Sequence, residues 1–191
     1  MEIKNTELVV IGGSAGSLQV ILDMARKLSK EIGFPILLVM HRKAQSVSIL
    51  PTLLQQFSSM EVIEAEDKTE IQKNKIYIVP ADYHVLFEDK KIISLDSSEK
   101  VNYSRPSIDV TFKSAAEIYG ESLVGILLSG ANADGVEGLE YIKKNNGRVW
   151  IQDPETAEVG YMPKHAVAAG IHDLIIMPDE LAAHINQLQT I

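Results

Sequence analysis

The sequence predicts an α/β protein with a doubly wound, mostly parallel sheet that is flanked by helices, as in Rossmann-like folds. Two observations carry this prediction. Short runs that are apolar throughout recur along the chain, which is typical of strands buried on both faces of a parallel sheet. Amphipathic segments with helical periodicity lie between these runs. Strand and helix therefore alternate in the order that a doubly wound sheet requires.

The apolar runs locate the strands, and the first amphipathic segment locates a helix. We expect a helix over residues 18–32, because its apolar side chains recur at helical spacing and share one face. The residues on that face are Leu18, Ile21, Leu22, Ala25 and Leu28. The expected strands lie within residues 7–13, 35–40, 74–80, 122–130, 148–153 and 173–178.

Two further helices are indicated by signals at their ends. Residues 107–120 follow Pro106, begin at Ser107, a natural N-cap, and stop at Gly120. Residues 134–147 close with two lysines and Gly147, as a helix C-terminus does. Both segments are therefore predicted to be helical.

Two segments depart from this alternation. In residues 84–95 two strand-like runs flank the polar sequence EDKK, which predicts an antiparallel β-hairpin appended to the sheet. The acidic residues 61–70 are interpreted as a solvated edge strand and turn. We find no internal repeat, low-complexity tract or linker, so a single domain over residues 1–191 is expected.

Composition excludes several classes of protein. The chain has no cysteine, which rules out disulfides, thiolate catalysis and cysteine-ligated metal. Its net charge of −8 argues against a nucleic-acid binder, which normally presents a basic face. No apolar run approaches the roughly 18 residues that a membrane span needs. The N-terminus lacks the features of a signal peptide, so we expect a cytoplasmic protein without membrane insertion.

The glycine-rich loop after the first expected strand allows two interpretations. Gly12, Gly13 and Gly16 fit no G-x-G-x-x-G register, and no G-K-[ST] follows, so a phosphate-binding loop is disfavoured. The same stretch matches G-x-S-x-G with Ser14 at its centre, the pattern of a nucleophile elbow. The simpler alternative is that Ser14 caps the following helix.

Two further polar residues are expected at the same edge of the sheet. His41 follows the second expected strand, and Asp134 lies in a Gly/Asn/Asp loop after the fourth. Carboxyl ends of neighbouring parallel strands lie about 4.8 Å apart, so Ser14, His41 and Asp134 can form a serine–histidine–aspartate arrangement. His41 could instead be a solvated side chain at a strand end, and Asp134 could be the N-cap of the following helix. The chain order Ser, His, Asp differs from that of α/β-hydrolases.

Longer stretches resemble a known family. VVIGGSAGSLQVI, PILLVMHR, AEDKTEIQKNKIYIVPADYH, YSRPSIDVTFKSAAEIYG, GILLSGANADGVEGL and QDPETAEVGYMPKHAV are together similar to the catalytic domain of CheB, the chemotaxis protein-glutamate methylesterase. The resemblance covers about residues 8–188, and RPSIDV and MPKHA are its most specific motifs.

The resemblance implies hydrolysis of glutamate γ-methyl esters on the cytoplasmic helices of chemoreceptors, with possible deamidation of receptor glutamines. Ser14 would be the nucleophile, His41 the general acid and base, and Asp134 the residue that orients His41. No metal or organic cofactor is implied. The candidate oxyanion donors are the backbone N–H groups of Ala15, Gly16 and Ala131.

The chain departs from the family pattern in several places. The family usually has threonine where Ala15 stands, G-M-G-x-D-G where this chain has GANADG, and often Met-Pro where Arg42 and Lys43 follow the histidine. The usual enzyme also carries an N-terminal receiver domain, whereas Met1 lies only a few residues before the first expected strand. The sequence is therefore expected to be either a stand-alone methylesterase domain, for which constitutive activity is predicted, or the catalytic part of a longer protein. A catalytically weak interaction module, or an esterase that acts on another signalling partner, is the alternative.

The remaining candidates are on the substrate side. Arg105 could approach an acidic receptor surface, or bond carbonyl groups around the Pro106 turn. Met162 could shape the cleft, or pack in the core. Asp109 is interpreted as a first-turn acid that favours the helix dipole. His84, His165, His172 and His184 show no metal-ligand spacing and are interpreted as surface or loop residues.

Overall fold

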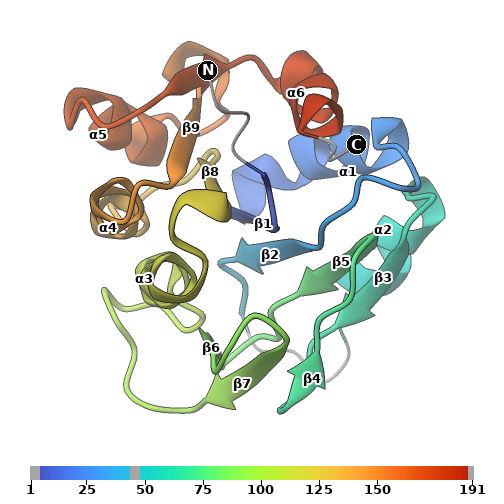
Figure 1. Cartoon of the computed structure of the whole chain (residues 1–191). Helices are drawn as coiled ribbons and strands as arrows, with labels where there is room; N and C mark the ends of the chain where they lie inside the picture. The colour runs from blue at the N-terminus through green and yellow to red at the C-terminus, as the bar shows by residue number, and fades with distance from the viewer. Residues whose placement is uncertain (1–4, 44–47, 189–191) are drawn as a thin grey trace.

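A seven-stranded parallel sheet forms the centre of the molecule. The computed structural model describes residues 5–43 and 48–188, so the predicted single domain over residues 1–191 includes residues outside these ranges. Within them the strands run in the order β10-β9-β8-β1-β2-β5-β3 (Figure 1). The predicted doubly wound fold is confirmed, and every expected strand is present. The strands are β1 (Leu8–Gly13), β2 (Ile36–Met40), β3 (Glu61–Glu64), β5 (Lys75–Ile78), β8 (Leu123–Leu127), β9 (Arg148–Gln152) and β10 (Leu174–Ile176).

Helices cover both faces of the sheet, which explains the uniformly apolar strands. In β1, Leu8 and Val10 pack into the hydrophobic cluster on one face, whereas Val9 and Ile11 pack into the cluster on the other. Successive side chains of a strand point to opposite faces, so a strand covered on both sides must be apolar at every position. One face carries α3 (Ile108–Tyr119), α4 (Val136–Lys144) and α5 (Tyr161–Ala168), and the other carries α1 (Leu18–Lys27), α2 (Leu50–Phe57) and α6 (Leu181–Gln187).

The first helix is shorter than its periodicity predicts. The pattern extends to residue 32, but α1 ends at Lys27, and Leu28 already has an extended backbone. Asn186 of α6 explains the break, because its amide donates to the Lys27 carbonyl at 3.1 Å while its side-chain oxygen accepts from the Ser29 N–H at 2.9 Å. Leu28 remains buried, so its place in the apolar pattern reflects burial after the helix has ended.

The end signals of α3 are confirmed, whereas those of α4 are confirmed only for its two lysines, because α4 ends at Lys144 with Asn145 as its C-cap, before Gly147. Ser107 caps α3 and its hydroxyl accepts from the Val110 N–H at 3.3 Å, while Gly120 ends that helix. The last turn of α4 carries Lys143 and Lys144.

The predicted hairpin is present as β6 (His84–Phe87) and β7 (Ile92–Asp96), which pair in antiparallel fashion. It belongs to a second, three-stranded sheet in which β4 (Thr69–Glu70) pairs with β7. This small sheet is anchored on α3, because Ser114 accepts from the Phe87 N–H and Thr111 donates to the Val85 carbonyl. The acidic segment 61–70 supplies the edge strand β3 and the start of this second sheet.

The strand order reverses beside β1. The chain builds β2, β3 and β5 on one side of β1 and then crosses over to build β8, β9 and β10 on the other side (Figure 1). In open α/β sheets the crevice at the carboxyl ends of the strands on either side of such a reversal is where ligands bind. The loops after β1, β2 and β8 therefore define the region to examine for a functional site. Within the described part of the chain, no helix is both long and apolar enough to cross a membrane.

Candidate active site

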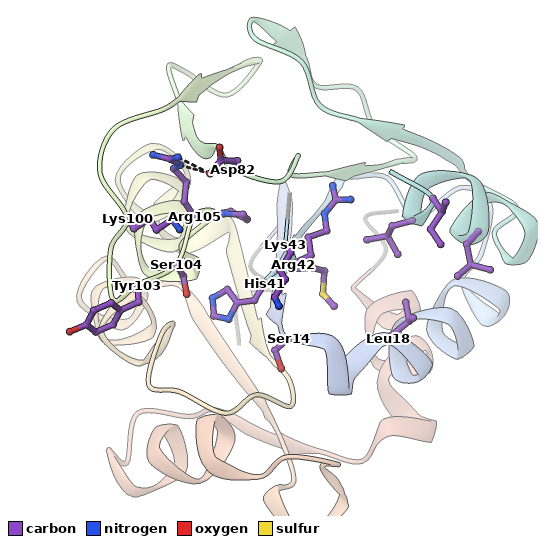
Figure 2. A pocket seen from close by; sticks show the side chains of 15 residues that line it. Ser14, Leu18, His41, Arg42, Lys43, Asp82, Lys100, Tyr103, Ser104 and Arg105 are labelled. Atoms are coloured by element: carbon purple, nitrogen blue, oxygen red, sulfur yellow. Dashed lines mark hydrogen bonds and ion pairs between the residues drawn. The ribbon is translucent and has the colours of Figure 1, made fainter. Parts of the chain in front are cut away.

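Three strand ends bring Ser14, His41 and Asp134 to one edge of the sheet. Ser14 follows β1, His41 follows β2, and Asp134 lies in the loop between β8 and α4. Backbone hydrogen bonds hold these loops together, since the His41 N–H donates to the Gly13 carbonyl and the Ser14 N–H donates to the Ser129 carbonyl, both at 3.0 Å. Ser14 and His41 line one cavity, and in Figure 2 they lie between Leu18 on one side and Tyr103 on the other.

His41 and Asp134 form a close side-chain pair. The distance between Nε2 of His41 and Oδ2 of Asp134 is 2.6 Å. The Asp134 side chain is fully buried, whereas the His41 side chain keeps 14% of its surface exposed. Because Nε2 faces the carboxylate, Nδ1 is the ring nitrogen that can accept a proton from a group in the cavity.

The Asp134 carboxylate faces the N-terminus of α3 and not its own helix. It accepts from the Ile108 N–H at 2.7 Å, from the Asp109 N–H at 2.9 Å and from the Ser107 hydroxyl at 3.0 Å. The alternative that Asp134 is an N-cap is wrong, because the N-cap of α4 is Gly135 and makes no side-chain capping bond. Burial raises the pKa of Asp134, but the hydrogen bonds from His41 and from the α3 backbone outweigh it and hold the pKa below its ordinary value.

Asp109 makes the reciprocal contact. It lies in the first turn of α3, and its Oδ1 accepts from the N–H groups of Gly135 and Gly138 at 3.0 and 2.6 Å. Each aspartate therefore satisfies backbone donors at the start of the other's helix. Asp109 is 2% exposed, so the interpretation of it as an ordinary first-turn acid was incomplete. Burial and the neighbouring charge of Asp134 raise the pKa of Asp109 to about 7.

The raised pKa of Asp109 predicts an unusual pH dependence of stability. The folded protein keeps the Asp109 proton up to about pH 7, whereas the unfolded chain releases it near the ordinary pKa of 3.8. Between these values the folded state binds more protons, so the contribution of Asp109 to the unfolding free energy falls as the pH rises. The depressed pKa of Asp134 acts in the opposite direction, because its contribution is lost as the pH falls.

The Asp109→Asn variant should remove the first of these two effects. The unfolding free energy of the wild type minus that of the variant is expected to decrease from about pH 4 to pH 7, by up to about 1.4 kcal/mol per pH unit. Urea denaturation of both proteins across this range measures the difference. Parallel pH profiles for the two proteins would show that Asp109 ionises normally.

His84 is part of the same network, which corrects the interpretation of it as a surface or loop residue. It lies on β6 and is 1% exposed. Its Nδ1 accepts from the Ser107 N–H at 3.1 Å, and its Nε2 lies 2.9 Å from the Glu99 carbonyl. These partners require a neutral ring with its proton on Nε2. His84 thereby fixes Ser107, the N-cap of α3, whose hydroxyl in turn bonds to Asp134.

The Ser14 side chain does not cap α1. The N-cap residue of that helix is Ser17, whose hydroxyl donates to the Ser14 carbonyl at 2.6 Å. The Ser14 hydroxyl instead donates to the Ser129 carbonyl at 3.3 Å, and it points away from the imidazole of His41 in Figure 2. Ser14 and His41 therefore share the cavity, and rotation about the Cα–Cβ bond of Ser14 is needed before its hydroxyl can reach His41.

The glycines before Ser14 permit close packing of the site. A Cβ atom on Gly12 would lie 2.5 Å from Cγ2 of Ile108, and one on Gly13 would lie 2.4 Å from Oγ of Ser17. Side chains at these positions would push α3 away from β1 or displace Ser17. Gly12 therefore lets the N-terminus of α3, which holds Asp134, approach the end of β1.

The candidate oxyanion donors come from two segments of the chain. Ala15 and Gly16 belong to the short 3-10 turn η1 (Ala15–Ser17), which follows Ser14 directly. Ala131 is exposed in the loop after β8. The neighbouring Asn132 has a structural contact, since its side-chain oxygen accepts from the Asp134 N–H at 3.0 Å.

A cavity of about 920 Å³ extends from Ser14 and His41. Arg105 lines it, but its guanidinium is committed to Asp82 at 2.6 Å and to the carbonyls of Ser97 and Ser98, so it supports the loop before α3. Met162 is fully buried against Gly130 and does not line the cavity, which agrees with the alternative that it packs in the core. The lining residues are Ser14, Leu18, Met40, His41, Arg42, Lys43, Ile49, Leu50, Leu53, Asp82, Lys100, Tyr103, Ser104, Arg105 and Pro106.

No cluster of three or more His, Cys, Asp or Glu side chains within the described ranges is placed to hold a metal ion. The groups that this edge of the sheet brings together are a serine hydroxyl, an imidazole and a buried carboxylate. Such a set can support nucleophilic acyl transfer.

The chain is similar in sequence and in fold to known proteins. The CheB methylesterase family model matches residues 9–185. A relative from Leptospira interrogans is 40% identical over 93% of this chain and 92% of its own length. The protein-glutamate methylesterase/protein-glutamine glutaminase of Thermotoga maritima is 34% identical over 89% of this chain, which spans 50% of that protein. The crystal structure of the Thermotoga maritima CheB methylesterase catalytic domain matches with a TM-score of 0.91 at 32% identity, over 96% of this chain and 99% of that one.

Proposed function

The chain belongs to the CheB methylesterase family, and from that premise we propose that it is a serine hydrolase that removes methyl groups from glutamate γ-methyl esters of chemoreceptors. The observation that carries the proposal is the 2.6 Å pair of His41 and the buried Asp134 beside Ser14. Deamidation of receptor glutamines is included, since the relative from Thermotoga maritima is named for both activities. We place the reaction in the cytoplasm and assign it to one CheB-type domain.

Acyl-enzyme formation is the proposed first stage. The Ser14 hydroxyl turns from the Ser129 carbonyl to Nδ1 of His41, which takes its proton as Oγ attacks the ester carbonyl. Asp134 stabilises the imidazolium that forms. The backbone N–H groups of Ala15, Gly16 and Ala131 are the proposed donors to the oxyanion. The C–O bond to the methoxy group then breaks, and His41 gives its proton to the departing methanol.

Deacylation repeats the proton transfers with water. His41 takes a proton from a water molecule as the water oxygen attacks the acyl carbonyl. The bond to Oγ breaks, Ser14 recovers its proton from His41, and glutamic acid is released and ionises. A glutamine side chain would follow the same course with ammonia as the leaving group.

The test is methanol release from membranes that carry chemoreceptors with isotopically labelled methyl esters. Release that is proportional to the concentration of this protein is expected, and the Ser14→Ala protein provides the blank. Ser14-dependent hydrolysis of small esters without release from receptors would move the substrate to another signalling protein. Absence of Ser14-dependent hydrolysis on every ester tested would instead favour a catalytically weak interaction module.

A further inference from the structure

The cavity is much larger than a methyl ester requires. Its volume of about 920 Å³ is in the range of sites that hold drug-sized ligands, whereas the group to be cleaved is a single methoxy group. The wall formed by α1 and α2 is apolar and includes Leu18, Leu50 and Leu53. In Figure 2 this wall, marked by Leu18, lies on one side of His41, and the loop that carries Lys100 and Tyr103 lies on the other. A longer segment of the substrate than the ester itself can therefore lie in this cavity.

The polar lining of the cavity is strongly cationic, although the chain as a whole carries a net charge of −8. Two of its cations are already paired, since Arg42 contacts Glu64 at 2.8 Å and Arg105 contacts Asp82. Lys43 and Lys100 are exposed and have no ion-pair partner among the described residues. These two ammonium groups are therefore available to an anion that enters with the substrate.

The proposed reaction itself produces such anions. Each turnover converts a neutral glutamyl ester into a carboxylate, so a substrate segment with several modified glutamates becomes more negative as it is processed. We propose that Lys43 and Lys100 bind free glutamate carboxylates next to the ester under attack, so that the site favours acidic, partly demethylated segments. This inference rests on the proposed function and specifies which residues flank the ester in a preferred substrate.

Two synthetic peptides test the inference directly. They share one glutamyl γ-methyl ester and an apolar neighbour, and differ only in having glutamate or alanine at the flanking positions. The selectivity is the ratio of kcat/KM for methanol release from the two peptides, taken within each protein, so that an effect on folding or on basal turnover cancels.

The wild type is expected to prefer the glutamate-flanked peptide by about two- to fivefold for each lysine, mainly through KM. Lys43→Gln and Lys100→Gln should each reduce the preference, and the double variant should abolish it. Raising the salt concentration should weaken the preference in the wild type, because exposed ion pairs are screened. Lys144→Gln removes an exposed charge from the end of α4, outside the cavity lining, and should leave the ratio unchanged.

Binding of both peptides to the Ser14→Ala protein separates this inference from the proposed function. Tighter binding of the glutamate-flanked peptide, lost when Lys43 and Lys100 are also replaced, supports the role of the lysines. Equal affinity for the two peptides, or a preference that survives in the double lysine variant, overturns it while leaving the esterase intact. If the wild type hydrolyses neither peptide and also releases no methanol from receptor membranes, the proposed function fails and this inference, which rests on it, fails with it.

Discussion

Replacing Ser14 by alanine is expected to lower kcat by on the order of 10⁴-fold or more on any ester that the protein hydrolyses. The substitution removes the only atom that can form the acyl-enzyme in the proposed mechanism. His41 and Asp134 would remain paired, but water would have to attack the ester without a covalent intermediate. The loss should therefore appear in kcat for small and large esters alike.

The fold should survive this substitution. The Ser14 hydroxyl makes one long hydrogen bond, to the Ser129 carbonyl at 3.3 Å, so its removal should cost less than about 1 kcal/mol of unfolding free energy. Urea denaturation of the variant measures this cost. Ser59→Ala is a suitable control, because Ser59 is exposed and lies outside the cavity lining. If Ser14→Ala retained activity within tenfold of the wild type, Ser14 would not be the nucleophile.

The sequence was sufficient to predict the sheet and the meeting of the three strand ends. A strand that is buried on both faces is a continuous run of apolar residues. Such runs can be recognised from the sequence alone, so each expected strand is present in the structure. Parallel strands bring their carboxyl ends to one edge whatever their exact order, which is why Ser14, His41 and Asp134 could be placed together.

The hydrogen bonds that hold the three site residues in position could not be predicted in the same way. Asp109 and His84 act through backbone N–H groups of segments that are distant in sequence, and these contacts depend on how α3 and β6 pack. An acid in a first helical turn has the same local pattern whether it faces solvent or a neighbouring helix. An aspartate just before a helix is equally ambiguous, so Asp134 was also open to the N-cap interpretation. Only the position of α3 shows that its carboxylate faces that helix and not its own.

The residues around Asp134 form one connected network of hydrogen bonds. His84 fixes Ser107, and Ser107 together with two α3 backbone groups fixes the carboxylate that holds His41. Asp109 ties the start of α4 back to α3. The orientation of the imidazole therefore depends on the relative position of two helices and a small sheet, and not on the loop after β2 alone.

Asp134→Asn is expected to lower kcat by on the order of 10⁴-fold, although only one atom changes. The groups around the carboxylate, Nε2 of His41, the Ile108 and Asp109 N–H groups and the Ser107 hydroxyl, all bond to it as donors in the proposed resting state. The amide nitrogen of asparagine is itself a donor, and at either oxygen position it would face a backbone N–H of α3. We therefore also expect a loss of about 1–3 kcal/mol in unfolding free energy, from a buried donor left without an acceptor.

The loss of activity has a separate cause, which a spectroscopic measurement can identify. An amide that donates to Nε2 of His41 forces the ring proton onto Nδ1, and Nδ1 can then no longer accept the proton of Ser14. Nitrogen-15 chemical shifts of the His41 ring should show this change of tautomer in Asp134→Asn but not in Ser14→Ala. If Asp134→Asn lost activity while His41 kept its proton on Nε2, the carboxylate would act through its charge, and stabilisation of the imidazolium would account for its whole effect.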